Sequence, residues 1–469
     1  MKTTWKFAAA LLGAAAMELV AAAAAGRGAG DSADVIAEST VRAHMEFLAS
    51  DAMNGRGSGT RDEWIAATYI AAQLRRCGLQ PLEGNEDFVQ AVEIARVEGV
   101  GAPTLHIDPD TAIRSEQMLV MNLSGADFRG PLQKYHPHTP IRPGAALLMP
   151  RDAVPDSAAQ LQSAGLVLWH ETPARRARWS ELKSRTIIVG RARISGVAAS
   201  AGAAALPPSQ IMLSDDAYAA ISELEEGSMA ALSVATRETL RSTWNAVGTL
   251  PGADKREKDD IILISAHLDH LGARDTGADR IYNGADDDAS GSTAVLALAE
   301  ALAKGKLLKR TVVFAWFGSE EAGGYGARYF VEKPVVPLDR IVANLEFEMI
   351  GRPDASIAPH TLWLTGWERT TLGPKLAAQG ARLVGDPHPA EQFFTRSDNF
   401  TLARRGVIAQ TVSSYGLHSD YHQPSDKLSR IDFAHMTESI QSMLVPIRWL
   451  ADSGFKPDWT PGGRPSAPP

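Results

Sequence analysis

Residues 261–270 read IILISAHLDH, and this stretch decides the fold class that the sequence predicts. Its first part, residues 261–266, is a short and mostly apolar run, which is typical of a strand buried on both faces of a parallel sheet. Similar runs follow at residues 311–317, 341–347 and 407–412. Because helical patterns separate these runs, residues 236–452 are predicted to form an α/β domain with a mixed, largely parallel central sheet flanked by helices.

The regions around this domain differ in composition. Residues 32–110 are expected to form the N-terminal part of the same domain, because a loop signal at residues 54–59 precedes a helical pattern. Residues 111–235 hold short strand-like runs with Ala- and Pro-rich connections, which predicts an inserted β-rich module. Residues 453–469 are rich in Pro and Gly, and they are predicted to be a disordered tail.

The N-terminus has the pattern of a secretory signal peptide over residues 1–25. Lys2 and Lys6 provide a positive start, residues 7–16 are a short apolar run, and the alanines at 23–25 offer a cleavage site. The sequence therefore predicts export, either to the periplasm or out of the cell, with a cytosolic alanine-rich helix as the alternative. No later run is apolar for long enough to cross a bilayer, so stable membrane insertion is not expected.

Charge and cysteine content narrow the classes of function. The formal net charge is −8, which argues against nucleic acid as a partner. Cys77 is the only cysteine, so the chain has no internal disulfide and no thiolate zinc site. Any metal must therefore be held by His and carboxylate side chains.

The first strand ends in a His-x-Asp pattern. His267 and Asp269 fall on the same side of an extended chain, and a metal-bound His commonly passes its second ring N–H to a carboxylate. Asp269 is thus expected to orient His267 as a ligand, although a lone His at a strand end also fits an ordinary polar residue. Ligands gather beyond the carboxyl ends of strands in such sheets, so the argument depends on four strand ends that all carry potential ligands.

Residues 283–291 read NGADDDASG and come just before a helical pattern. Three adjacent carboxylates repel one another unless a cation or a helix N-terminus compensates. Asp288 or Ser290 would suit a helix cap. Because only one of the three aspartates need bind a metal, the metal site and the helix cap both remain open.

The next two strands end in further acids. Of Glu320 and Glu321, one can bind a metal while the other acts as a general base; a solvated acidic turn is the alternative. Glu346 and Glu348 lie in an otherwise apolar strand, where a buried carboxylate needs a partner. A metal would supply that partner, and so would an ion pair with Arg352.

A second imidazole follows the last strand. His422 lies in the segment HSDYHQPSD, residues 418–426. Two imidazoles with several carboxylates suit zinc, and also manganese or cobalt, whereas ligands that are all oxygen would favour magnesium or calcium.

In combination and in order, these motifs resemble the di-zinc aminopeptidases of clan MH, the family that contains aminopeptidase Y and secreted bacterial leucyl aminopeptidases. The resemblance covers residues 236–452, and the loop Asn54-Gly55-Arg56 also resembles the N-terminal segment of that family. The insert at residues 111–235 resembles a protease-associated domain.

The resemblance implies a role for each matching residue in a centre of two zinc ions. Asp287 matches the carboxylate that bridges both zincs, and Glu320 matches the general base. The other implied ligands are His267, backed by Asp269, and Glu348 for the first zinc, and Glu321 and His422 for the second. Glu348 stands where many members have Asp, which leaves Glu346 as the alternative, and Tyr421 resembles a tyrosine that polarises the substrate carbonyl.

The function that follows from this resemblance is hydrolysis of the N-terminal peptide bond of peptides with a free amino group. A carboxypeptidase or dipeptidase of the same fold would share the metal ligands, and a glutaminyl cyclase would use one working zinc. A metal-free binding module would be expected to lack ligands, and every role in the site has a residue here. Side-chain preference and oligomeric state are not predicted by the sequence.

Overall fold

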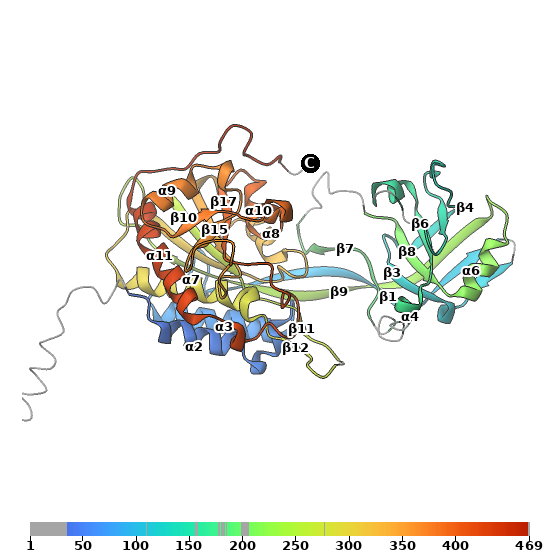
Figure 1. The fold of residues 1–469 in the computed structure, drawn as a ribbon, viewed down its shortest axis with the longest axis horizontal. Coiled ribbons are helices and arrows are strands. Elements are labelled where there is room, and N and C mark those ends of the chain that lie inside the picture. Colours follow the sequence, from blue (N-terminus) through green and yellow to red (C-terminus); the bar gives the residue numbers. More distant parts are fainter. Residues whose placement is uncertain are drawn as a thin grey trace, which may run out of the picture.

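The computed structural model describes residues 35–467, apart from residues 109, 154, 156–157, 177–178, 180–182, 184, 198–205 and 276. The predicted signal peptide, residues 1–25, lies outside the described residues. The described chain forms a larger lobe with most of the helices and a smaller lobe built mainly of strands (Figure 1). Two long strands, β1 (Val89–Ile107) and β9 (Met229–Leu250), run from one lobe into the other.

The larger lobe is organised around a mixed sheet. In order across this sheet, the strands are β16 (Leu383–Gly385), β15 (Leu362–Leu364), β17 (Ala409–Ser413), β14 (Ile341–Phe347), β10 (Ile261–His267), β13 (Thr311–Phe317) and β9. Strand β10 is parallel to both β13 and β14, and β14 is parallel to β17. The pairs β9–β13 and β15–β17 are antiparallel. The predicted fold class of a mixed α/β sheet flanked by helices is confirmed.

Helices cover both faces of this sheet because its central strands are apolar on both sides. Ile262 and Ile264 of β10 pack in the core formed with α2 (Glu38–Leu48), α3 (Arg61–Arg76), α7 (Gly291–Lys304) and α11 (Phe433–Asp452). Ile261 and Leu263 point the other way, into the core formed with α8 (Tyr325–Glu332) and α10 (Asn399–Ala403). A further helix, α9 (Leu372–Ala378), packs on the α11 side. Burial on both faces is the reason why these strands lack alternating polar residues.

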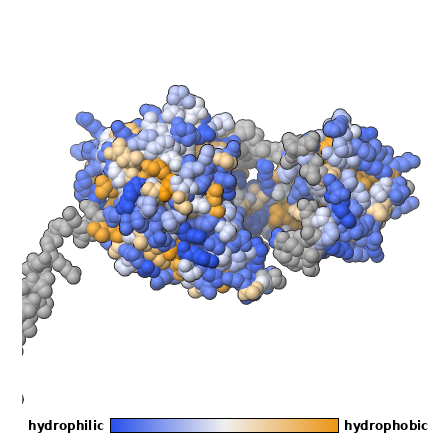
Figure 2. Space-filling view, viewed as in Figure 1, coloured by the Kyte–Doolittle hydropathy of each residue, from blue (hydrophilic) through white to orange (hydrophobic). Residues whose placement is uncertain are grey.

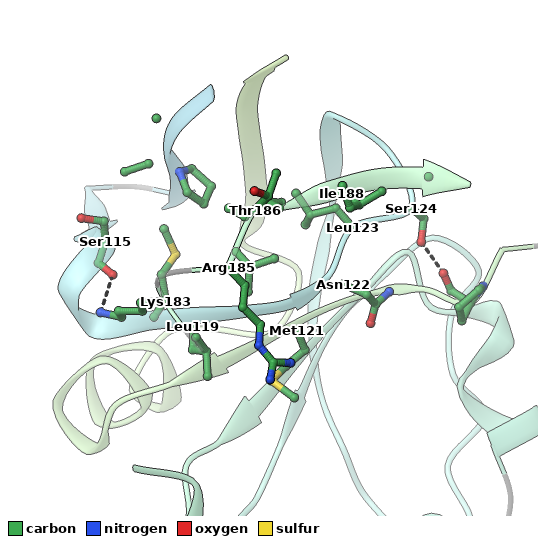
Figure 3. A pocket seen from close by; sticks show the side chains of 18 of the residues that line it. Ser115, Leu119, Met121, Asn122, Leu123, Ser124, Lys183, Arg185, Thr186 and Ile188 are labelled. Carbon is green, nitrogen blue, oxygen red and sulfur yellow. Dashed lines mark hydrogen bonds between the residues drawn. The ribbon is translucent and has the colours of Figure 1, made fainter. Parts of the chain in front are cut away.

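The smaller lobe has a hydrophobic core of its own, to which Leu132, Leu166 and Ile211 contribute. Its remaining elements are β2 (Thr111–Ile113), β3 (Met118–Asn122), β4 (Asp127–Lys134), β5 (Ala146–Met149), β6 (Leu166–His170), α4 (Pro173–Arg176), β7 (Ile188–Ile194), β8 (Ser209–Leu213) and α6 (Asp215–Ser222). A cavity of about 860 Å³ lies among β3, the start of β7 and residues 101–103 (Figure 3).

The two lobes are joined by a ribbon of β1 and β9, and β7 runs from the smaller lobe along β1 as a third strand over residues 94–98. Strands β1 and β9 pair antiparallel from Val89 with Ala246 to Ile107 with Ala230. The predicted module boundary at residues 235–236 therefore falls within β9, where the strand leaves the smaller lobe. A boundary inside a strand has no turn or linker composition to mark it.

The prediction that residues 453–469 form a disordered tail is wrong for residues 453–467. Phe455 and Trp459 pack against the core of the larger lobe, and Trp459 forms a β-bridge with Thr370. The Thr460 amide also donates to the Arg369 carbonyl at 2.8 Å. Pro and Gly prevent regular secondary structure here, but two aromatic anchors are enough to hold the segment on the domain.

The visible face of the smaller lobe is mostly hydrophilic, and hydrophobic residues are scattered over that of the larger lobe (Figure 2). Within the part of the chain that the structure describes, no helix combines the length and the apolar character that crossing a membrane requires.

Candidate metal centre

The predicted site residues converge because parallel strands end at the same edge of the sheet. His267 is the last residue of β10, and Glu320 and Glu321 follow β13 by a few residues. Glu348 comes directly after β14. His422 lies in the loop between β17 and α11.

The three adjacent aspartates lie in the turn Ala285–Ser290, just before α7, whose backbone is not helical at Asp287 and Asp288, and all three are buried. Asp288 accepts hydrogen bonds from the amides of Gly291 (2.9 Å) and Met349 (3.1 Å), so it caps the start of α7. Asp286 accepts from the Gly351 amide at 2.7 Å. The helix cap is therefore made by Asp288, which leaves Asp287 for another role.

Asp287 is shared by two groups of potential metal ligands. In the first group, ligand atoms of His267, Asp287 and Glu348 lie within 4.8 Å of one another. In the second group, the same holds for His270, Asp287 and Glu321. The side chains of His267 and Asp287 meet at 3.2 Å between Nε2 and Oδ1. One carboxylate in contact with two neighbouring ligand groups is the arrangement that a bridged pair of metal ions requires.

His422 reaches the second group from the opposite loop. Its Nε2 lies 3.2 Å from Asp287 Oδ2 and 3.2 Å from Glu321 Oε2. His270 competes for the same carboxylates, because its Nδ1 is 2.7 Å from Glu321 Oε1. The structure thus places two imidazoles, those of His270 and His422, beside Glu321. The sequence motifs name only His422 as a ligand there. The signal for His270 is its position three residues after His267, directly beyond the end of β10.

The residues of this cluster fit a bound divalent cation. The Nε2 atom of His267 is buried and has no hydrogen bond among the described residues, and the His270 nitrogen that faces the cluster is Nδ1. Burial raises the pKa of Glu348, and it raises the pKa of Glu320 well above its usual value. Imidazole nitrogens and carboxylate oxygens are ligands typical of zinc, and a cation here would satisfy both His267 Nε2 and the crowded carboxylates.

Glu320 stands beside the ligand groups without belonging to either. Its backbone amide donates to Asp269 Oδ1 at 2.9 Å, and the Ser58 hydroxyl donates to Asp269 Oδ2. Asp269 lies close to His267 mainly through its main-chain carbonyl, which is 3.2 Å from Nδ1, while its carboxylate is 3.8 Å away. The Asp269 carboxylate therefore holds the turn that carries Glu320 as well as lying near His267.

Glu346 and Glu348 have separate surroundings. Glu346 is fully buried and accepts from the Asn399 amide at 2.5 Å, away from either ligand group. Glu348 is in the first ligand group. Tyr421 stacks on the ring of His422, with ring centres 3.9 Å apart, and lines a small cavity together with Glu348.

Two buried residues of the N-terminal segment hold the site together. The Arg56 guanidinium donates to the carbonyls of Leu268 (3.0 Å), Asn283 (2.8 Å) and Gly284 (3.0 Å), which ties the end of β10 to the start of the aspartate turn. Glu63 of α3 accepts from the Ser319 amide at 2.8 Å, one residue before Glu320. Burial raises the pKa of Glu63 to about 8.

The sequence motifs do not assign Arg56 or Glu63 a role at the site. Both lie more than 200 residues from the partners named above, so no local pattern connects them. The loop signal at residues 54–59, the helical pattern after it and the family resemblance of Asn54-Gly55-Arg56 mark this segment in the sequence, but they assign it no contact with the site.

Comparison with known proteins gives independent information on this domain. Residues 245–445 match the model of peptidase family M28. Over 177 residues, the chain is 30% identical to leucine aminopeptidase 2 of Trichophyton equinum. The aligned region covers 36% of this chain and 33% of that protein. The match thus spans about a third of that relative's length.

Solved structures share the fold over most of the chain. The aminopeptidase from Aneurinibacillus sp. strain AM-1 aligns with a TM-score of 0.56 at 19% identity, covering 90% of this chain and 96% of that chain. A zinc aminopeptidase from Bacillus subtilis aligns with a TM-score of 0.52 at 17% identity, covering 89% and 96%. These alignments show a common fold that includes both lobes. Together with the sequence motifs and the geometry of the ligand groups, the family match shows that residues 245–445 of this chain form a peptidase family M28 domain.

Proposed function

We propose that the protein is a zinc-dependent aminopeptidase that hydrolyses the N-terminal peptide bond of peptides. The observation that carries this proposal is the pair of ligand groups that share Asp287, with Glu320 unligated beside them. The relatives whose names describe them as aminopeptidases, including the leucine aminopeptidase 2 of Trichophyton equinum, support the same activity.

Two zinc ions would be held by the residues that the motifs and the geometry both single out. Asp287 would bridge the ions, with His267 and Glu348 on one and Glu321 and His422 on the other. His270 is close enough to Glu321 to fix its orientation. Bound zinc would polarise the substrate carbonyl and lower the pKa of water.

The chain's own residues would move the protons. Glu320 would take a proton from the attacking water and return it to the nitrogen of the leaving amine. Its position suits this role, because Asp269 and Glu63 hold the backbone of its turn while its carboxylate stays outside the ligand groups. Tyr421, stacked on His422, would donate to the oxygen of the scissile carbonyl as negative charge develops there.

The buried acids also offer a reason for exopeptidase action. A free N-terminal ammonium group would find carboxylates at the cluster, whereas a blocked or internal peptide would bring no positive charge to them. The same metal ligands would serve a carboxypeptidase or dipeptidase, so the preferred end of the substrate is the part of the proposal that needs measurement. We further propose export to the periplasm or the extracellular space, on the basis of the signal-peptide pattern in residues 1–25.

The test is metal analysis of the purified protein together with hydrolysis of aminoacyl-anilides and their N-acetylated counterparts. About two zincs per chain and cleavage of free-amine substrates alone would support the proposal. Cleavage only of blocked substrates or of carboxyl-terminal bonds would replace it with the carboxypeptidase alternative. A protein that binds no zinc and remains inactive after zinc addition would refute the catalytic proposal.

A further inference from the structure

A cavity of about 40 Å³ lies next to the ligand groups, among β14, β15 and β17. It shares Glu348 and Tyr421 with the site, so it begins where the substrate's N-terminal residue would sit. The side chain of that residue branches from the carbon atom next to the scissile carbonyl. This cavity is therefore where a substrate side chain would enter.

The cavity is small, and its walls are tightly packed. Met349, Trp363 and Tyr415 are 3%, 2% and 8% exposed. The Trp363 ring stacks on Phe393 with centres 5.3 Å apart, and Phe393 also contacts Tyr415 edge-on. The volume is enough for roughly three water molecules. A carboxylate, with three heavy atoms, fits this space better than the branched side chain of leucine.

One wall carries a hydrogen-bond donor with no acceptor. Trp363 Nε1 is buried and has no partner among the described residues. An indole N–H can only donate, and leaving it unpaired when buried costs about 1–3 kcal/mol. A ligand with an acceptor atom would remove this cost.

A positive charge lies at the same cavity. The Arg396 guanidinium carbon is 4.9 Å from the centre of the Phe393 ring. Arg396 and Tyr421 both line this cavity. Arg396 pairs with Glu391 at 3.4 Å, and the two side chains are 42% and 44% exposed. Such an exposed pair is weak, so the guanidinium can still balance a second carboxylate.

We propose that this cavity selects a short acidic side chain, that of aspartate, at the N-terminal residue of the substrate. The proposal rests on the aminopeptidase function given above. An aspartate carboxylate would accept a hydrogen bond from Trp363 Nε1, and the charge of Arg396 would balance its negative charge. Glu348, at the entrance of the cavity, belongs to the first ligand group. Asparagine would fill the same volume without the charge, and leucine would exceed the volume.

The experiment compares kcat/KM of the zinc-loaded full chain for the p-nitroanilides of aspartate, asparagine, alanine and leucine. We expect aspartate to exceed asparagine by about tenfold, which corresponds to about 1.4 kcal/mol. Arg396→Gln should bring this ratio close to one. Arg382→Gln is a matched control, because Arg382 also pairs with an exposed glutamate, at 3.1 Å, and is 43% exposed. The control should keep the wild-type ratio.

Trp363→Phe tests the donor, since it removes the N–H and keeps one aromatic ring in the wall of the cavity. We expect it to lower the preference of both aspartate and asparagine over alanine by about two- to tenfold. Cleavage of the alanine substrate with no preference for aspartate over asparagine would overturn this proposal and leave the aminopeptidase function intact.

If no free-amine substrate is cleaved, the aminopeptidase function fails, and binding then decides the proposal about the cavity. Calorimetry with free aspartate and free asparagine on the zinc-loaded protein gives this second readout. Tighter binding of aspartate that is lost in Arg396→Gln supports the selection of an acid. Equal binding of the two amino acids overturns it.

Discussion

The two lobes differ in the size of their cavities and in the potential metal ligands that lie beside them. The smaller lobe holds a cavity of about 860 Å³, and several of its polar wall residues already have partners. Lys183, for example, donates to the carbonyl of Ser115 (Figure 3) and to that of Glu116, both at 3.1 Å. The larger lobe has a cavity of about 40 Å³ beside two potential ligand groups and an unpaired indole N–H. A large apolar pocket is the usual first guess for a functional site. In this protein, imidazoles and carboxylates that converge indicate the proposed site better than volume does.

The origin of this contrast lies in the kind of residue that follows the parallel strands. In the larger lobe, β10, β13 and β14 are parallel and end at one edge, so the acids and imidazoles that follow them meet. The smaller lobe has parallel pairs too, such as β5 with β6, but no group of potential metal ligands was found among its described residues. A shared edge concentrates whatever residues follow the strands: in the smaller lobe it brings Arg151, His170 and Asp215 into ion pairs, and in the larger lobe it brings imidazoles and carboxylates together.

The largest expected effect is that of Asp287→Asn, because this carboxylate belongs to both ligand groups. We expect the zinc content to fall from about two per chain to near zero, and activity to fall with it. Metal analysis after dialysis and anilide hydrolysis would measure both. Asp339→Asn, at an exposed position of the same lobe, is the control. Retention of both metals by Asp287→Asn would contradict the bridging role.

Glu320→Gln separates proton transfer from metal binding. We expect kcat to fall by about 10²–10⁴-fold while zinc content stays at the wild-type level, because Glu320 lies outside the ligand groups. Glu368→Gln, at a side chain that is 76% exposed, should leave both quantities unchanged. An active Glu320→Gln enzyme would show that another residue is the base.

Arg56→Lys tests whether the N-terminal segment supports the metal centre. A lysine cannot donate to the three carbonyls of Leu268, Asn283 and Gly284 in the planar geometry of a guanidinium. We expect zinc affinity, measured by competition with a chelator, to fall by about 10–100-fold, as for other residues that position ligands. Arg75→Lys is the control, since Arg75 is 68% exposed. Unchanged zinc affinity in Arg56→Lys would mean that the ligand groups form without this tie.

The smallest effect on activity is expected from a change in the core of the smaller lobe. Leu168 is fully buried there, and Leu168→Ala should lower the unfolding free energy of that lobe by about 2–5 kcal/mol. Zinc content and kcat for a small anilide should stay within about twofold of wild type. Leu307→Ala, at a residue that is 76% exposed, is the control for stability. A large loss of zinc from Leu168→Ala would show that the lobes are coupled.

Much of the larger lobe could be predicted from local sequence because its central strands are apolar on both faces. The predicted runs at residues 261–266, 311–317 and 341–347 match β10, β13 and β14 to within one residue. The run predicted at residues 407–412 became β17, Ala409–Ser413, because its pairing with β14 begins at Ala409. Pairing partners set strand ends, and they lie too far along the chain for a local pattern to show them.

The sequence by itself determined the order of the potential ligands along the chain and their place after successive strands. It also limited any metal site to imidazoles and carboxylates, since Cys77 is the only cysteine. These features depend on residue type and on short-range periodicity, which a single sequence displays directly.

Only the tertiary structure decided which of these residues meet. It brought His270 to Glu321, placed Glu348 rather than Glu346 in a ligand group, and tied the aspartate turn to β10 through Arg56. It also packed the C-terminal segment on the larger lobe through Trp459. Each of these contacts joins side chains that are distant in the sequence, so it follows from the packing of whole elements and has no signature in the local pattern of residues.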